Sequence, residues 1–119
     1  MTRTRLAVGS YGERCAVRHL VDAGQRVVDR NWRTDQGEID IIAWDGETLA
    51  FCEVKTRRGA TFGSPAEAVG AAKARRLRRL AAAWLASHEA HPREIRFDVV
   101  EVYVRAAGPA RVEHIKAAF

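Results

Sequence analysis

A pair of apolar segments joined by an Asp-Gly turn constrains the fold of this 119-residue chain more than any other feature. Residues 38–43 and 48–55 are rich in apolar and β-branched side chains, and Asp45-Gly46 lies between them. Asp-Gly between two apolar runs is among the strongest signals for a β-hairpin. With Asp45 and Gly46 as the two turn residues, the sequence predicts antiparallel strands in which Glu38 lies opposite Glu53.

The charged residues of this hairpin are expected on one face of the sheet. Because side chains alternate between the two faces of a strand, Glu38, Asp40, Glu53 and Lys55 share a side. Asp40 and Glu53 are then diagonal neighbours, and both carboxylates can reach one cation. Like charges directly opposite each other destabilise a hairpin by up to about 1 kcal/mol, so the Glu38–Glu53 repulsion must be offset. A solvent-exposed face with hydrated carboxylates is the alternative interpretation.

The rest of the chain predicts an α-β-β-β-α-β order followed by a short extra strand. Outside the hairpin, the expected elements are helices at 6–23 and about 71–90 and strands at 25–32, 96–104 and 111–117. Gly24 and Pro92 end the two helices, and Ser64-Pro65-Ala66-Glu67 is typical of a helix start. We therefore expect an α/β fold, with a mixed sheet flanked by helices. The length favours one domain over residues 1–119, with residues 1–5 flexible.

Each predicted helix carries one charged residue on its apolar face. In the first helix this residue is Glu13, and a carboxylate on a buried face costs several kcal/mol unless it is paired or bound to a cation. Gly9 and Gly12 on the same face allow a close approach to the sheet, which would bring Glu13 to the acidic strands. An ion pair with a buried arginine is the alternative. In the second helix Lys73 either extends past the helix end or reaches the acidic site.

The charge balance favours a polyanionic partner. Twenty Lys and Arg against 15 Asp and Glu give a net charge of +5, which points to nucleic acid before a membrane. Five cations on the second helix form a natural patch for phosphates, although a solvated helix face is the alternative: Lys73, Arg75, Arg76, Arg78 and Arg79. The N-terminus lacks an apolar signal segment. Cys15 and Cys52 are expected to be free thiols in a reducing compartment. We expect a cytoplasmic protein.

Two motifs in this chain resemble the signature of the PD-(D/E)xK nuclease superfamily. They are Gly37-Glu-Ile-Asp-Ile-Ile-Ala43 and Phe51-Cys-Glu-Val-Lys-Thr-Arg57. Together with Gly12-Glu13, Arg30-Asn-Trp-Arg33, Gly63-Ser-Pro65 and Arg96-Phe-Asp-Val-Val100, they make the chain similar to the YraN-like family of small bacterial predicted endonucleases. The resemblance covers roughly residues 11–119. Ile39 stands before Asp40, where the literal motif has proline.

This resemblance implies a restriction-endonuclease-like core, as in archaeal Holliday-junction resolvases, and a metal-dependent DNA endonuclease. It implies that Asp40 and Glu53 are metal ligands, that the Val54 carbonyl and Glu13 add to the ligand set, and that Lys55 is the catalytic lysine. The expected cofactor is Mg²⁺ or Mn²⁺, which prefer oxygen ligands and activate water for phosphodiester hydrolysis. A nuclease fold that only binds nucleic acid, without turnover, is the alternative. A third interpretation is an acidic face that docks a protein partner.

The remaining expectations concern the substrate and assembly. Arg57 and Arg58 are expected to add to the nucleic-acid contacts, and DNA rather than RNA is the expected ligand. The short connections leave no insertion that could read base edges, so selectivity should come from DNA shape, such as a branch or an end. Symmetrical cutting of two strands would require a homodimer. The candidate surface is the edge strand at 111–117 with the apolar residues that end in Phe119.

Overall fold

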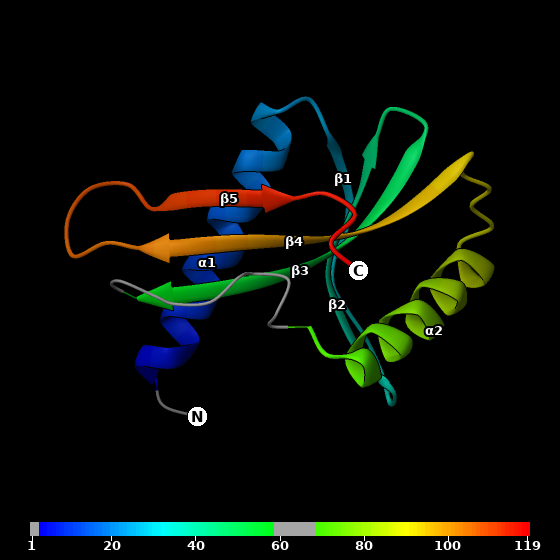
Figure 1. The fold of residues 1–119 in the computed structure, drawn as a ribbon, viewed down its shortest axis with the longest axis horizontal. Helices are drawn as coiled ribbons and strands as arrows, with labels where there is room; N and C mark the ends of the chain where they lie inside the picture. The colour runs from blue at the N-terminus through cyan, green and yellow to red at the C-terminus, as the bar shows by residue number, and fades with distance from the viewer. Residues whose placement is uncertain (1–2, 59–68) are drawn as a thin grey trace.

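The computed structural model describes residues 3–58 and 69–119, and it confirms the predicted order of elements (Figure 1). The elements are α1 (Arg3–Asp22), β1 (Arg26–Thr34), β2 (Gly37–Asp45), β3 (Thr48–Arg58), α2 (Ala71–Ser87), β4 (Glu94–Val104) and β5 (Arg111–Ile115). The predicted α/β fold class, with a mixed sheet flanked by helices, is likewise confirmed. The predicted helix start at Ser64-Pro65-Ala66-Glu67 lies outside the described residues.

The five strands form one sheet in the order β1-β2-β3-β4-β5. Neighbouring strands are antiparallel, except that β3 and β4 are parallel. A parallel pair needs a long crossover connection, and α2 lies in the segment that joins β3 to β4. β1 and β5 are therefore the two edges of the sheet.

The two helices pack on opposite faces of the sheet. Ala16 and Leu20 of α1 pack with Ala50 and Cys52 of β3, together with Ile41, Ala43, Val100 and Val102. Leu77, Leu80 and Trp84 of α2 pack with Leu49 and Phe51, together with Ile39, Ile42, Ala81 and Phe97. Consecutive residues of β3 thus point into different cores, as the alternation of a strand requires.

The β2–β3 register differs by two residues from the predicted one. Asp45 pairs with Thr48, so Gly46 and Glu47 form the turn rather than Asp45 and Gly46. Gly46 has a φ of 62°, in keeping with a type II′ turn, which places glycine at the first central position. A shift of two residues leaves every side chain on its predicted face.

The shifted register removes the predicted contact between Glu38 and Glu53. Glu38 instead lies beside Arg33 of β1, with 2.8 Å between Arg33 Nε and Glu38 Oε2. No cation is needed to offset a repulsion between these two glutamates. Beyond the last β2–β3 pair, Ile41 and Cys52, the next residues of the two strands are Asp40 and Glu53. Asp40 is therefore the carboxylate that lies beside Glu53.

The chain after β5 folds back against the core on the α2 face. Ala117 has a φ of 52°, and the amide of Ala118 donates to the carbonyl of Phe97 at 2.8 Å. Phe119 packs on Phe97, with ring centroids 5.5 Å apart. The predicted strand at 111–117 is therefore two residues too long, and the ring of Phe119 is half-buried against Phe97. The dimer surface at this edge stays a prediction.

Both helices differ from their predicted boundaries by only a few residues. α1 begins at Arg3 and ends at Asp22. α2 ends at Ser87, before the predicted 90, because His88 caps the helix and Glu89 adopts a φ of 50°. In the described part of the chain, neither helix is long and apolar enough to cross a membrane. The cytoplasmic location stays a prediction.

Candidate functional site

Asp40 and Glu53 come together where β2 and β3 separate. The paired part of these strands ends at Ile41 and Cys52, and the two carboxylates belong to the next residues. Oδ2 of Asp40 accepts a hydrogen bond from the backbone amide of Val54 at 2.8 Å. Asp40 and Glu53 are each only 8% exposed. The structure therefore places the two predicted metal ligands side by side in a largely buried position.

Burial raises the pKa of Asp40 to about 7, and the charge of Glu53 acts in the same direction. The hydrogen bond from Val54 lowers this pKa without offsetting the other effects, and the charges of Glu13 and Glu38 raise it further. Near neutral pH, Asp40 thus retains a proton for part of the time. A cation between the carboxylates would favour the ionised form.

Two lysines contact the same oxygen of Glu53. Lys73 Nζ forms a hydrogen-bonded ion pair with Oε1, and Lys55 Nζ lies 3.5 Å from that atom. Burial lowers the pKa of Lys55, as does the nearby positive charge of Lys73, while Glu53 opposes these effects. Burial also lowers the pKa of Lys73, but the hydrogen bond to Glu53 and the charges of Glu53 and Asp40 together act against it, and the net shift is upward. Of the two alternatives for Lys73, the structure supports contact with the acidic site.

A cavity of about 230 Å³ opens between the start of β2 and the first half of α2. Its lining comprises Gly37, Glu38, Asp40, Glu53, Lys73, Arg76, Leu77 and Leu80. Gly37 has a φ of 138°, and a Cβ there would lie 3.4 Å from Leu80 Cδ1. A Cβ would fit at this distance, so it is the positive φ, which residues with a side chain rarely adopt, that favours glycine where β2 begins against α2. This contact places the helix beside the carboxylates.

α1 brings Glu13 toward the same end of the β2–β3 pair. A Cβ on Gly12 would overlap the side chain of Thr56, which confirms the predicted close approach of helix and sheet at this glycine. At Gly9 no atom of the described residues would contact an added Cβ, so the close approach is not seen there. Glu13 is partly buried, and its charge contributes to the raised pKa of Asp40. Three predicted site carboxylates therefore interact electrostatically.

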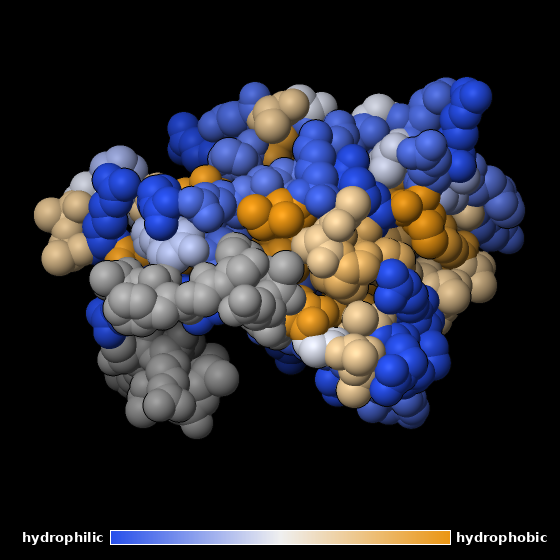
Figure 2. All heavy atoms as spheres, in the orientation of Figure 1, coloured by the Kyte–Doolittle hydropathy of each residue, from blue (hydrophilic) through white to orange (hydrophobic). Residues whose placement is uncertain are grey.

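The arginines of α2 border this cavity. Arg75, Arg76, Arg78 and Arg79 are all exposed, and the outer side of α2 includes hydrophilic surface (Figure 2). Arg76 lines the cavity itself, whereas the guanidinium of Arg78 lies 5.2 Å from the ring centroid of Phe97. The predicted phosphate-binding patch is therefore continuous with the carboxylate site.

Sequence reasoning missed Glu101, which holds one of the predicted DNA-contacting arginines. Glu101 is fully buried, and its Oε1 accepts a hydrogen bond from Arg57 Nε. Its Oε2 has no hydrogen-bond partner in the described structure. Lys55 and Glu101 are register partners on β3 and β4, so Arg57 is drawn toward Lys55. A single charge within the apolar run Val99–Val104 was the signal that could have identified Glu101.

The sequence model of the uncharacterised protein family UPF0102 matches residues 12–102. This chain belongs to the UPF0102 family. It is the YraN family that the sequence resembles, so that prediction is confirmed. A UPF0102 protein of Salinispora arenicola is 64% identical over the full length of both chains. One from Beutenbergia cavernae is 58% identical over 96% of this chain and 97% of its own length, and one from Frankia alni is 54% identical over 98% of each.

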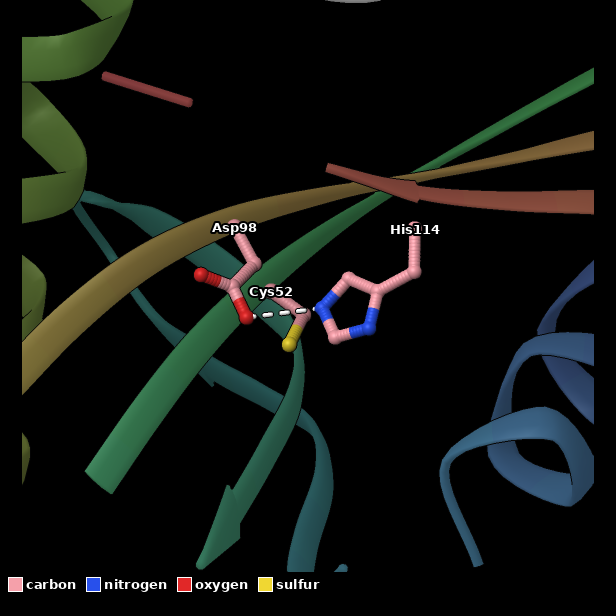
Figure 3. Close-up of side chains that lie close together, drawn as sticks. All are labelled: Cys52, Asp98 and His114. Atoms are coloured by element: carbon pink, nitrogen blue, oxygen red, sulfur yellow. Dashed lines mark hydrogen bonds and ion pairs between the residues drawn. The ribbon is translucent and has the colours of Figure 1, made fainter. Parts of the chain in front are cut away.

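This UPF0102 chain has a second polar cluster on the α1 side of the sheet (Figure 3). The nearest possible ligand atoms of Cys52, Asp98 and His114 lie within 4.8 Å of one another. Both carboxylate oxygens of Asp98 already have hydrogen-bond partners. Oδ1 accepts from Arg96 Nε at 2.8 Å and from the Ala117 amide at 3.0 Å. Oδ2 accepts from Arg96 Nη2 at 2.9 Å and lies 2.8 Å from His114 Nε2.

These contacts favour a structural role for the second cluster. Burial raises the pKa of Asp98, but the hydrogen bonds from His114, Arg96 and the Ala117 amide, together with the charge of Arg96, lower the net pKa. Burial raises the pKa of the Cys52 thiol. A metal ion would require the thiolate of Cys52 and would compete with Arg96 for Asp98. Asp98 instead anchors the segment after β5, and Cys52 lies on the face away from the acidic site, as predicted.

Proposed function

We propose that this UPF0102 protein is a Mg²⁺- or Mn²⁺-dependent endonuclease that hydrolyses DNA phosphodiester bonds. The observation that carries the proposal is the adjacency of Asp40 and Glu53 at the end of the β2–β3 pair, with Lys55 on the same strand. These residues occupy the positions of the nuclease signature that the two sequence motifs resemble. A buried carboxylate pair of this kind is costly unless cations balance it.

The donors in this site fit a hard divalent cation. Carboxylate and carbonyl oxygens are the ligands that Mg²⁺ and Mn²⁺ prefer. The N–H and C=O groups of a residue in an antiparallel ladder face the same neighbouring strand. Because the Val54 amide donates to Asp40, the Val54 carbonyl is expected to face the same opening. Asp40, Glu53 and the Val54 carbonyl would then hold the ion, with Glu13 as an additional carboxylate.

Each site residue has a defined task in this proposal. A bound divalent cation would polarise the phosphate and lower the pKa of a water ligand. Lys55 orients the attacking water or stabilises the charge that develops on the phosphate. Arg76 and the other exposed arginines of α2 bind neighbouring phosphates through charge. Glu101 holds Arg57 near Lys55, where its guanidinium can contact the substrate backbone.

We also propose that the protein selects DNA by shape and acts as a homodimer. Within the described ranges, the connections between strands span only residues 35–36, 46–47 and 105–110, which leaves little to enter a groove and read bases. Cutting two strands symmetrically requires two copies related by a two-fold axis. β5 is one edge of the sheet, and together with the apolar residues that end in Phe119 it is the proposed contact surface. Light scattering with and without branched DNA tests this assembly.

Cleavage assays test the proposed function. Purified protein is incubated with branched, single-stranded and duplex DNA in Mg²⁺, Mn²⁺ or EDTA, beside Asp40→Asn and the hairpin-tip control Glu47→Gln. We expect metal-dependent cleavage of branched DNA or ends by the wild type and Glu47→Gln, and none by Asp40→Asn. If no substrate is cut with either metal while DNA still binds, the protein is a binding module. Cleavage by Asp40→Asn at the wild-type rate would contradict the assignment of this site.

A further inference from the structure

We infer that the ammonium group of Lys73 takes the place of a divalent cation at Glu53, and that Lys73 leaves Glu53 when such a cation binds. The inference rests on the proposed metal site and extends it to a residue expected only to reach the acidic site or contact nucleic acid. Lys73 Nζ pairs with Glu53 Oε1, an oxygen of the carboxylate proposed as a metal ligand.

The position of Lys73 is unfavourable apart from this ion pair. Lys73 lies in the first turn of α2, which begins at Ala71 after the cap residue Gly70. A cation near a helix N-terminus opposes the helix dipole. The ammonium group of Lys55, a second cation, lies 3.5 Å from the same Glu53 oxygen and repels that of Lys73. The carboxylates of Glu53 and Asp40 are the groups that attract Lys73 into this position.

One ammonium group neutralises only part of the negative charge of the site. Glu53 and Asp40 lie side by side, and Glu13 and Glu38 act on Asp40 as well. A divalent cation brings twice the charge of Lys73 and can contact both central carboxylates. It would therefore compete effectively with Lys73, and the repulsion between the two cations would favour departure of the lysine.

The structure provides a place for Lys73 once it leaves Glu53. Its side chain is 32% exposed and lies at the wall of the 230 Å³ cavity. Arg76 lines the same cavity one helical turn further along α2, so the two cations share a helix face. A released Lys73 would stand beside Arg76 and could contact a substrate phosphate. The inference therefore gives Lys73 two successive partners, Glu53 and then the phosphate backbone.

Mn²⁺ binding to variants of the full chain tests this inference without reference to activity. Calorimetry compares the wild type with Lys73→Met and with Arg75→Met, a control that removes one charge from an exposed position of the same helix. We expect Lys73→Met to bind Mn²⁺ about fivefold or more tightly than the wild type, since a unit charge a few ångströms from the ion is removed. Arg75→Met should change the affinity much less. Unchanged or weaker binding by folded Lys73→Met overturns the inference.

Lysine labelling of the wild-type protein supplies a second measurement in case Lys73→Met does not fold. An amine-acylating reagent is applied with and without Mn²⁺, and modified residues are quantified by mass spectrometry. Labelling of Lys73 should rise with Mn²⁺, while that of Lys116, which pairs with Asp45 at 3.2 Å, should stay constant. Constant labelling of Lys73 contradicts the inference.

Asp40→Asn separates this inference from the proposed function. If the wild type binds Mn²⁺, Asp40→Asn does not, and neither Lys73 measurement responds, only the displacement of Lys73 is refuted. If Asp40→Asn binds Mn²⁺ as tightly as the wild type, or if the wild type does not bind Mn²⁺, both the metal site and the role of Lys73 are refuted.

Discussion

The side chain of Asp40 accepts the backbone hydrogen bond that Val54 would otherwise give to a neighbouring strand, at 2.8 Å. Pairing between β2 and β3 stops at Ile41 and Cys52, so a carboxylate replaces a main-chain acceptor there. This exchange fixes the orientation of Asp40 and holds it beside Glu53. It also keeps a carboxylate in a place where burial and neighbouring charges penalise ionisation.

Asp40 should make the metal-free protein less stable as the pH rises. Its pKa is about 7 in the folded protein and about 3.8 when unfolded, so the folded state binds more protons between these values. This stabilising contribution is complete below the unfolded pKa and is lost as the pH rises through about 7. Urea unfolding at pH 5.5 and pH 8 should show a smaller free energy of unfolding at pH 8.

The variant Asp40→Asn should reduce this pH dependence, because asparagine does not titrate. Each unit of pKa difference is worth about 1.4 kcal/mol, so the change should be measurable by urea unfolding. Glu47→Gln, on the exposed hairpin tip, serves as the control and should follow the wild type. An Asp40→Asn variant with the full pH dependence of the wild type would show that another group is responsible.

Lys55 should act in chemistry rather than in binding. Lys55→Ala should leave DNA affinity nearly unchanged and lower the cleavage rate by about 100-fold or more, the usual effect of removing a group that stabilises the transition state. Single-turnover cleavage and filter binding at matched salt measure the two quantities. A variant that cuts at the wild-type rate would remove Lys55 from the mechanism.

The exposed arginines of α2 should determine the salt dependence of DNA binding. Neutralising Arg75 and Arg79 should reduce the slope of log affinity against log salt by about 0.9 for each lost contact with a duplex phosphate. Arg93→Gln is the control, because Arg93 pairs with Glu47 at 3.3 Å, outside α2. Equal slopes for the wild type and the double variant would place the phosphate contacts elsewhere.

Asp98 should contribute to stability and not to metal binding. Asp98→Asn leaves His114 without its carboxylate partner and Arg96 with Asp45 alone, and breaking a buried ion pair in this way costs about 3 kcal/mol or more. Thermal unfolding should show this loss, whereas Glu113→Gln on β5 should change little. Loss of Mn²⁺ binding in a folded Asp98→Asn variant would instead assign the metal to the second cluster.

The acidic face could be predicted from the sequence because alternation along a strand does not depend on a register shift of two residues. The register itself could not be predicted, since an Asp-Gly pair indicates a turn without showing which two residues form it. Helical periodicity placed Glu13 and Lys73 on inward faces but could not identify their partners. The roles of Glu101 and Asp98 escaped recognition because Arg57, the partner of Glu101, and His114 and Ala117, two of the partners of Asp98, lie far away in the sequence.

Anomalous diffraction from crystals grown with Mn²⁺ tests the central claim most directly. We expect one strong peak about 2.1 Å from oxygens of Asp40, Glu53 and the Val54 carbonyl, with Lys73 Nζ moved away from Glu53. A peak among Cys52, Asp98 and His114, or no bound Mn²⁺ at Asp40 and Glu53, would contradict the claim.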